Sequence, residues 1–509
     1  MITRETRAFD DSVDQSKWDV VILGGGTAAL LAATAMAKHL PHLNVLVVRS
    51  TKLGVIGVGE GTIATIGRFL HEYLSIDTLR FHREVRPSIK LGIQFKWGSK
   101  TPYHYSFAPQ FSAANPLQQN FSRSIGEFCG SDARFANLSS SLMFHGKVAS
   151  LNANGSPVLS PRFAYHLENR AFVGFLERYT DELGVKKIDA IVDRVAVNQK
   201  GVESLMLDTG QQVRAKLFVD CSGFRSELLG KALKEDFVSF GDSLWCDRAV
   251  VGGWKREEEP YYAFTTAEAM NSGWSWRIEH DELVNRGYVY SSSFMSDEAA
   301  ETEFCVKNPK ITDTRVIQFR SGAYQQSWVQ NVVAIGNAAG FVEPLEATAI
   351  GFMTSAIDQV IAILKSGSEI TDIHRSIFNR SQAANWTQTR DFLALHYKPN
   401  QESQSAFWKA CRNDIPLGEA QDILDFYQAT GPEFRALQSR LRSDIFGAEG
   451  YLSVLVGQRV PYPRIENTVS VEQTKWMNYQ QRLRRVGSGG MEMSNYLEMV
   501  RGGYIDPPI

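Results

Sequence analysis

The sequence predicts an α/β (α+β) fold in which a Rossmann-like nucleotide-binding module is joined to a mixed-sheet module and a helical C-terminal region. Near the N-terminus an apolar run, a glycine-rich turn and an alanine-rich stretch follow one another, as in a βαβ unit. Residues 240–320 alternate in the way of antiparallel strands. Beyond about residue 350 the composition is helical and strand patterns are scarce.

The composition indicates a globular protein with a large core and more than one structural module. The 509 residues include 54 lysines and arginines against 56 aspartates and glutamates, a net charge of −2, and 43% are hydrophobic. The balanced charge argues against a nucleic-acid-binding protein, because neutralising phosphates requires a basic patch. The hydrophobic fraction argues against a disordered chain.

The spacing of the cysteines and the hydropathy of the chain indicate its cellular compartment. The five cysteines are scattered and form no CxxC pair, which predicts reduced, mostly buried thiols and fits a cytoplasmic protein. The uncharged stretch over residues 20–37 holds three consecutive glycines and follows acidic residues. This pattern indicates a strand, a turn and a helix rather than a membrane span or a signal peptide.

The first elements form a candidate anion site. Residues 20–23 are fully apolar, as in a buried parallel strand; the turn at 24–29 and a helix over 30–40 follow, and residues 44–48 are a second strand. Small residues in such a turn let the backbone approach a pyrophosphate, and the helix N-terminus supplies N–H groups. The candidate contacts are Gly24, Gly26, Thr27 and Ala28.

Arg49 ends the second strand, where an acid normally binds a ribose hydroxyl. A basic residue there can indicate the 2′-phosphate of NADP, and the alternative is FAD bound without that carboxylate contact. Two later segments, at 220–223 and 336–340, also follow apolar strands and resemble further cofactor turns. A fold that returns discontinuously to FAD, of the GR2 type, needs such segments, and no second glycine fingerprint indicates a separate NADPH domain.

The rest of the chain is divided by its patterns. Strands and turns are expected over 90–160, a helix over 164–183, a strand ending in a turn over 218–223 and a strand over 287–292. We predict a polar extension at 1–17, a discontinuous FAD-binding module at 18–235 and 315–365, and a substrate-binding module at 236–314 and 366–509.

Seven motifs occur in a fixed order along the chain. They are GGGTAA at 24–29, IGVGEGT at 56–62, SIKLGIQF at 88–95, AYHLE at 164–168, FVDCSGFR at 218–225, SGWSWRI at 272–278 with GYVYSSSF at 287–294, and GNAAGFVEPLEATAI at 336–350. With these segments the chain resembles the flavin-dependent tryptophan halogenase family over nearly its whole length.

The resemblance implies a reaction. Reduced FAD (FADH2) from a separate flavin reductase reacts with O2 to a flavin hydroperoxide, a halide ion attacks its outer oxygen, and the hypohalous acid passes through a tunnel to a lysine beside an aromatic substrate. Lys90 stands in the place of that lysine, and Glu346 occupies the second catalytic position, where it would orient the electrophile or accept the ring proton. Thr348 and Ala349 would hold the halide on backbone N–H groups.

Further residue roles are implied by the resemblance alone. Trp274 and Trp276 would lie near the flavin and keep the substrate from direct oxygenation, and His104 is a candidate for stacking on the substrate. Homodimers are common in the family, and the helical part from about 366 would cover the substrate pocket. The remaining cofactor contacts would be Ser50, Leu53, Ile56, Val58, Gly61, Val195, Asn337 and Ile350.

Each of these residues also has an ordinary structural interpretation. Lys90 could be a solvated surface side chain, Glu343 and Glu346 could be acids of a helix's first turn, and His104 could be a structural histidine. Alternating tryptophans usually pack one face of a sheet. Two rival functions also stay open: an FAD-dependent aromatic monooxygenase on the same fold, and a non-catalytic flavin-binding protein.

The chain departs from the family pattern at several positions. Glu279 replaces a proline and adds a charge near the indoles, and Ala347 and Ala349 replace serine and glycine beside the halide site. If Ala349 requires a positive φ, alanine is penalised there. Because the C-terminal aromatic stretch that binds free tryptophan is not clearly present, the expected substrate is an electron-rich aromatic or indole-type compound rather than tryptophan itself. Halide preference stays open.

Overall fold

The computed structural model describes residues 17–54, 57, 59–112, 115, 121, 124–129, 133–367, 369–463 and 470–507. Residues 1–16 of the predicted extension lie outside this set, as do Ile56 and Val58. Within it, no helix combines the length and the apolar character needed to cross a membrane. All five cysteines are free thiols and four of them are buried, which confirms that prediction.

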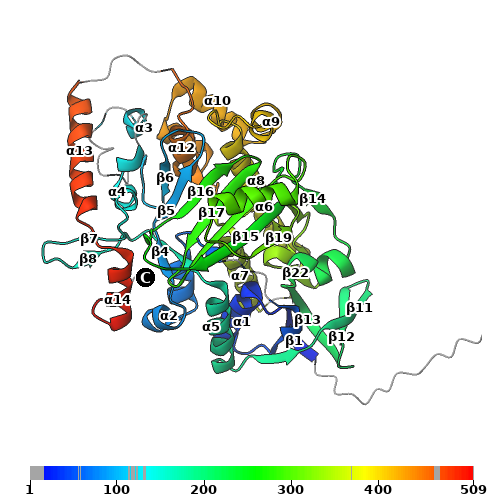
Figure 1. Ribbon diagram of the computed structural model, residues 1–509. Coiled ribbons are helices and arrows are strands. Elements are labelled where there is room, and N and C mark those ends of the chain that lie inside the picture. Colours follow the sequence, from blue (N-terminus) through cyan, green and yellow to red (C-terminus); the bar gives the residue numbers. More distant parts are fainter. Residues whose placement is uncertain are drawn as a thin grey trace, which may run out of the picture.

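The first sheet is eight-stranded and is built around the predicted βαβ unit (Figure 1). Its parallel part runs in the order β10-β2-β1-β13 and continues to β22, while β12 and β11 add an antiparallel edge. Helix α1 packs against both β1 and β2 and against α5 and α7. The elements are β1 (Lys17–Leu23), α1 (Thr27–His39), β2 (Val45–Arg49), α5 (Asn169–Glu182), β10 (Lys186–Asp189), β11 (Val192–Asn198), β12 (Gly201–Leu207), β13 (Gln212–Asp220), β21 (Trp328–Val329) and β22 (Val332–Ala334).

The helix predicted over 164–183 begins later than expected. Residues Ala164–Leu167 form strand β9, which pairs antiparallel with β3 (Glu60–Gly61) and β4 (Ser88–Lys90), and α5 starts only after Glu168 caps it. All four β9 residues are buried, so pairing with distant strands outweighs local helix preference. Strands and turns predicted over 90–160 are likewise interrupted by helices, at α3 (Ile125–Phe128) and α4 (Leu138–Phe144).

The second sheet is seven-stranded, in the order β19-β15-β18-β17-β16-β5-β6, and confirms the antiparallel pattern predicted over 240–320. Strands β5 and β6 complete this sheet although they lie within the range predicted for the FAD module, because β5 pairs in parallel with β16. The elements are β5 (Gly92–Lys96), β6 (Tyr103–Ser106), β15 (Arg248–Lys255), β16 (Thr265–Met270), β17 (Gly273–Glu279), β18 (Leu283–Tyr290), α6 (Asp297–Lys307) and β19 (Thr314–Gln318).

Small sheets and short helices connect the two large sheets. Strands β14, β20 and β23 form a three-stranded antiparallel sheet, and β7 and β8 form a hairpin. Helix α2 precedes β4, and π-helical turns lie at Arg68–Tyr73 and Glu227–Ala232. The bounds are α2 (Thr78–Glu84), β7 (Ser150–Leu151), β8 (Pro157–Val158), β14 (Phe237–Ser239), β20 (Gly322–Tyr324) and β23 (Gly340–Phe341).

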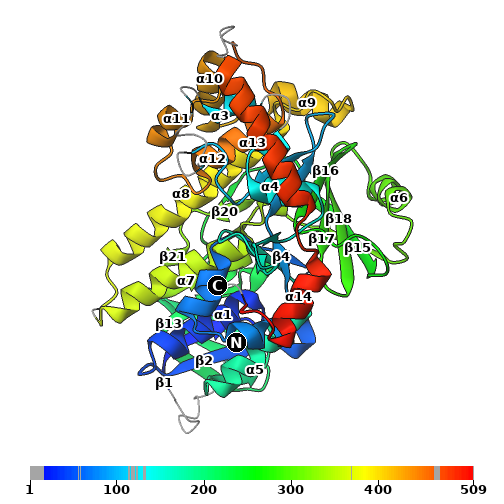
Figure 2. The same ribbon diagram turned by 90° about the vertical axis from the view of Figure 1, so that its left-hand side faces the viewer.

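The C-terminal part is helical, as predicted. The long helix α8 runs from beside α7 to the helical cap formed by α9, α10, α11 and α12, and α13 returns along α4 (Figure 2). The C-terminal end of α8 therefore packs beside the second sheet, where its last side chains reach the candidate site. The bounds are α7 (Ala349–Lys365), α8 (Asp372–Tyr397), α9 (Ala406–Asp414), α10 (Ala420–Thr430), α11 (Phe434–Arg440), α12 (Gly447–Gly457), α13 (Ser470–Ser488) and α14 (Met493–Gly502).

Candidate active site

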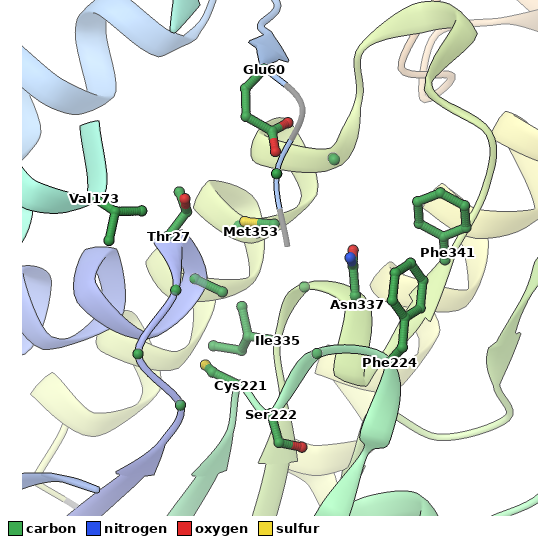
Figure 3. Close-up of a pocket in the computed structure, with 18 of the residues that line it drawn as sticks. Thr27, Glu60, Val173, Cys221, Ser222, Phe224, Ile335, Asn337, Phe341 and Met353 are labelled. Carbon is green, nitrogen blue, oxygen red and sulfur yellow. The ribbon is translucent and has the colours of Figure 1, made fainter. Parts of the chain in front are cut away.

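A cavity of about 580 Å³ opens at the carboxyl ends of the parallel strands of the first sheet and extends to the second sheet. Three segments far apart in the sequence meet around it: the turn before α1, the residues after β13 and the residues after β22. Figure 3 shows Thr27, Ser222 and Asn337 from these three segments around one open space. Carboxyl ends of parallel strands are where open α/β sheets bind their ligands.

The turn before α1 has the geometry of a phosphate cradle. Gly24 has φ 141°, and a Cβ atom there would lie 2.3 Å from the carbonyl oxygen of Cys221. Gly26 is the extended N-cap of α1, no side chain caps the helix, and its first turn holds no acid. The helix start is therefore available to an anion, and the residues fit the pyrophosphate of a dinucleotide such as FAD.

Arg49 at the end of β2 forms an ion pair. Its Nη1 lies 3.2 Å from Oε1 of Glu177 on α5, and both residues line the cavity. A carboxylate from a helix therefore lies beside the end of β2, although the strand itself ends in an arginine. Arg49 is engaged by this partner, which leaves the sequence signal for a 2′-phosphate without structural support.

Most of the remaining predicted contacts line the cavity, and two do not. Val195 packs against the hydrophobic core of the first sheet, whereas Val192 reaches the cavity, and β11 carries a register shift between Val192 and Arg194. Ile350 is 1% exposed and lies in the core, while Ala349 before it faces the cavity, as helical phase requires. Those that line it are Gly24, Gly26, Thr27, Ala28, Ser50, Leu53, Gly61, Lys90, Asn337, Thr348 and Ala349.

Lys90 ends β4 and is fully buried, so the alternative of a solvated surface side chain is wrong. Its Nζ donates a hydrogen bond to the carbonyl oxygen of Thr62 at 3.1 Å and lies 5.4 Å from the ring centroid of Phe107. Burial lowers the pKa of Lys90 to about 7, against the attraction of the Glu346 carboxylate. A proton donor that is half ionised near neutral pH therefore borders the cavity.

Glu346 lies in a 3₁₀ turn, Pro344–Glu346, that precedes α7 rather than in the first turn of that helix. The positive φ in this segment falls on Ala347, at 55°, and Ala349 already has the helical conformation. The condition under which Ala349 would be penalised, a positive φ, is therefore not met. The cost, of roughly 1–2 kcal/mol, falls on Ala347 instead.

Consecutive residues of α8 hold the two acids of this turn. His396 Nε2 lies 2.8 Å from Glu346 Oε1, and the Tyr397 hydroxyl donates to Glu343 Oε2 at 2.6 Å. Glu343 Oε2 also accepts from the indole Nε1 of Trp274 at 2.6 Å. Burial raises the pKa of Glu343 to about 7, which the two donors oppose.

The indole pair lies on one face of β17, as period-two alternation requires. The ring centroids of Trp274 and Trp276 are 6.1 Å apart and both side chains are buried. Trp276 borders the cavity, and Trp274 stands behind it, fixed by Glu343. The two tryptophans therefore pack on one face of the sheet, and the pair also reaches the cavity through Trp276.

A family model described as Tryptophan halogenase matches residues 19–473. The chain belongs to the tryptophan halogenase family. A tryptophan 7-halogenase of Lentzea aerocolonigenes is 30% identical over 436 residues, which cover 81% of this chain and 82% of the relative. A tryptophan 6-halogenase of Streptomyces albogriseolus is 28% identical over 448 residues, covering 81% and 82%.

Solved structures of the tryptophan halogenase family show the same fold. MibH, a lathipeptide tryptophan 5-halogenase, superposes with a TM-score of 0.85 at 30% identity over 97% of this chain and 95% of its own. BrvH, a flavin-dependent halogenase from Brevundimonas sp. BAL3, gives a TM-score of 0.82 at 26% identity over 96% and 100%. The predicted family and fold class are confirmed, and the protein is a flavin-dependent enzyme.

The contacts of Glu279 and His104 bear on two residues singled out in the sequence. The Glu279 carboxylate accepts hydrogen bonds from Arg256 and Arg277, so two cations compensate the charge that replaces the family's proline. The buried ring of His104 contacts Gln94 through Nε2 and the carbonyl oxygen of Ser140 through Nδ1, and it does not border the cavity. This is the arrangement of a structural histidine.

The sequence analysis missed several residues of the site. Glu60 lies inside the IGVGEGT motif, but only the structure shows its side chain directed into the cavity (Figure 3). Burial raises the pKa of Glu60 to about 7. His396, Tyr397 and Glu177 lie on helices without distinctive motifs, and only helix packing brings them to the site.

Proposed function

We propose that this protein is an FADH2-dependent halogenase that uses O2 to oxidise a halide ion and transfers the halogen to an electron-rich aromatic or indole-type substrate. The single observation that carries the proposal is Lys90: a fully buried ammonium at the edge of the nucleotide cavity, in electrostatic reach of the Glu346 carboxylate. Membership of the tryptophan halogenase family supports it.

The cavity residues would hold FAD by its phosphates and ribose. The pyrophosphate would lie on the turn at Gly24–Thr27, and Glu177 would take the ribose contact that β2 does not offer. Bound and reduced, the flavin would supply the activated oxygen that converts halide into hypohalous acid. Thr348 and Ala349, at the uncapped start of the 17-residue helix α7, would hold the halide.

Lys90 and Glu346 would then act as acid and base on the halogen and the substrate. The Lys90 ammonium hydrogen-bonds the hypohalous acid; a ring carbon forms the carbon–halogen bond with a π electron pair as the halogen–oxygen bond breaks. The leaving hydroxide takes a proton from Lys90 and becomes water. Glu346 accepts the ring proton, the C–H electron pair restores aromaticity, and return of this proton to Lys90 closes the cycle. The pKa of Lys90, about 7, suits such a donor.

The indoles and the relatives limit the substrate class. Trp276 on the cavity wall and Trp274 behind it would keep the substrate away from the flavin, so that halogen rather than oxygen reaches it. The named relatives act on tryptophan and, for MibH, on a lathipeptide tryptophan. An indole-type ring is therefore the substrate core that we propose, and free tryptophan itself is not assigned.

A separate flavin reductase would supply the reduced cofactor. The rival function, an aromatic monooxygenase, has no use for Lys90, and the enclosure of this cation beside the cavity favours the halogenase. A homodimer and a cytoplasmic location stay predictions. Light scattering on the purified protein and fractionation of the producing cells test them.

The deciding experiment supplies all components and reads product mass. The enzyme is incubated with FAD, a flavin reductase, NADH and chloride, bromide or iodide over a panel of indoles, phenols, pyrroles and tryptophan-containing peptides. The expected result is a product heavier by the halogen minus one hydrogen. Products heavier by oxygen alone would establish the monooxygenase. The absence of product with every combination of halide and substrate would overturn the proposal.

A further inference from the structure

The contact between His396 and Glu346 requires a proton that neutral imidazole and a free carboxylate do not have. His396 Nδ1 lies 2.8 Å from the carbonyl oxygen of Phe392, which can only accept, so this nitrogen must donate. In a neutral ring Nε2 would then be a bare acceptor. It lies 2.8 Å from Oε1 of Glu346, another acceptor when ionised. One proton must therefore lie between Nε2 and Oε1.

The His396 ring cannot turn away from this contact. Its backbone carbonyl accepts from the indole Nε1 of Trp97 at 2.7 Å and from Gln458 Nε2 at 3.1 Å, which fixes the end of α8. The ring packs between those of Phe95 and Phe392, with centroid distances of 5.3 and 4.8 Å. Because the side chain is 0% exposed, water cannot supply an alternative partner.

The charged groups around the pair indicate which atom holds the proton. Glu346 interacts electrostatically with the Lys90 ammonium and with the hydroxyls of Tyr103 and Tyr105, and His396 does so with the Glu343 carboxylate. The cation of Lys90 stabilises a negative Glu346, and the acid Glu343 stabilises a positive His396. Imidazole is also the stronger base of the two in water. All of these effects place the proton on His396.

We propose that His396 is a positioning residue, an imidazolium that holds Glu346 as an oriented carboxylate inside the protein. The inference rests on the proposed function, in which Glu346 is the base. Oε1 is occupied by His396, and among the described residues no hydrogen bond reaches Oε2. Oε2 is therefore the atom left to take the ring proton, and His396 keeps it ionised and aimed.

The protonation state can be read without any turnover. Protein labelled with ¹⁵N at its ten histidines is observed by two-bond ¹H–¹⁵N correlation at pH 7, with and without FAD, and His396→Asn identifies the signal. Both ring nitrogens of His396 should be protonated in the wild type. In Glu346→Gln the amide can donate to Nε2, so the ring should become neutral. A wild-type ring with a single protonated nitrogen would overturn the proposal.

Turnover then separates positioning from packing. His396→Phe should lower kcat by roughly 10- to 100-fold with KM within about 3-fold, since a base is misoriented rather than a binding group lost. His396→Gln keeps an N–H donor toward Glu346 and should recover at least about half of that loss on a logarithmic scale. Tyr397→Phe removes the neighbouring contact to Glu343 and should leave the His396 ring doubly protonated.

The outcomes distinguish this inference from the proposed function. Unchanged kcat in His396→Phe, or no recovery by His396→Gln in a variant that still binds FAD, contradicts the positioning role. A doubly protonated ring in an enzyme that halogenates no substrate would instead refute the function and leave the ion pair standing. Halogenation by an enzyme with a neutral His396 ring would refute the ion pair alone.

Discussion

The two ends of the cavity are built in opposite ways. At the glycine end, a turn without side chains brings backbone atoms and a bare helix start to the space, and Gly24 approaches Cys221 so closely that no Cβ fits. At the lysine end, the buried side chains of Lys90 and Trp276 line the space. Glu346 does not line it, but this buried acid contacts His396 and interacts electrostatically with Lys90. One end presents backbone dipoles at an uncapped helix start, and the other carries ionisable side chains.

Because the two ends are built from different groups, cofactor binding and proton chemistry should be separable by mutation. Backbone N–H groups cannot titrate, so the glycine end should bind its ligand with little dependence on pH. The lysine end contains groups such as Lys90 and Glu343, whose pKa values burial moves to about 7. Variants at one end should therefore change cofactor affinity, and variants at the other should change turnover.

The largest effect is expected at the lysine end. Lys90→Ala should lower halogenation by at least about 100-fold, because the proton donor is lost from the oxidant's site, while FAD affinity stays within a few-fold of the wild type. Product formation by mass spectrometry and FAD fluorescence titration measure the two. Lys96→Ala is the matched control, since Lys96 is exposed on the adjacent strand β5.

A Lys90→Ala variant that keeps full product formation would contradict the role proposed for the lysine end. It would mean that proton transfer does not depend on the lysine end. The monooxygenase would then become the better interpretation if the product carried oxygen.

The converse change is Gly24→Ala at the other end. The new Cβ would lie 2.3 Å from the Cys221 carbonyl oxygen at φ 141°, so the turn must shift, and FAD should bind at least about 10-fold more weakly. Gly210→Ala is the control: φ is also positive, at 83°, but no atom lies within 4 Å of its Cβ. Wild-type affinity in Gly24→Ala would show that the turn does not contact the cofactor.

The pH dependence should arise from the lysine end. Turnover should fall as pH rises through about 7, because Lys90 loses its proton there, whereas FAD affinity should change little. The pH dependence of stability has the opposite sign to that of turnover. The unfolded lysine stays charged to about pH 10, so the unfolded state binds more protons above pH 7 and the free energy of unfolding rises with pH.

Urea unfolding of the wild type beside Lys90→Met measures this linkage. The methionine variant should be the more stable protein, and its advantage should shrink as pH rises from about 7 toward 10. A constant difference would mean that the pKa of Lys90 is not lowered by burial.

The smallest effect concerns Arg49. Its ion pair with Glu177 is partly exposed, so Arg49→Ala should change FAD affinity by no more than about 5-fold, and NADP should compete with FAD in neither protein. Fluorescence titration with each nucleotide checks both statements. Loss of NADP binding in Arg49→Ala would instead revive the 2′-phosphate interpretation.

The sequence predicted correctly those elements whose conformation is set by residues close together along the chain. The turn at 24–29 follows from backbone demands that its own residues meet, and the second sheet follows from alternation within each strand. The start of the 164–183 helix was wrong because β9 is defined by strands β3 and β4, whose residues lie far away in the sequence.

The sequence also could not predict the direction in which some side chains point. Val195 and Ile350 lie beside residues that reach the cavity, but a register shift in β11 and the phase of α7 turn them into the core. His396 and Tyr397 meet their acids across 50 and 54 positions, so no spacing rule could have identified them.

Sequence motifs predicted the family and the strand–turn–helix unit, and they singled out Lys90 and Glu346 as candidate site residues, because motifs and backbone demands act over a few residues. Only the tertiary structure decided that Lys90 is buried, that Arg49 pairs with Glu177, and that His396 binds Glu346. Burial and hydrogen bonding sum contributions from segments that are distant along the chain. The proton chemistry that we propose for this site therefore depends on how α8, β4 and the turn before α7 pack together.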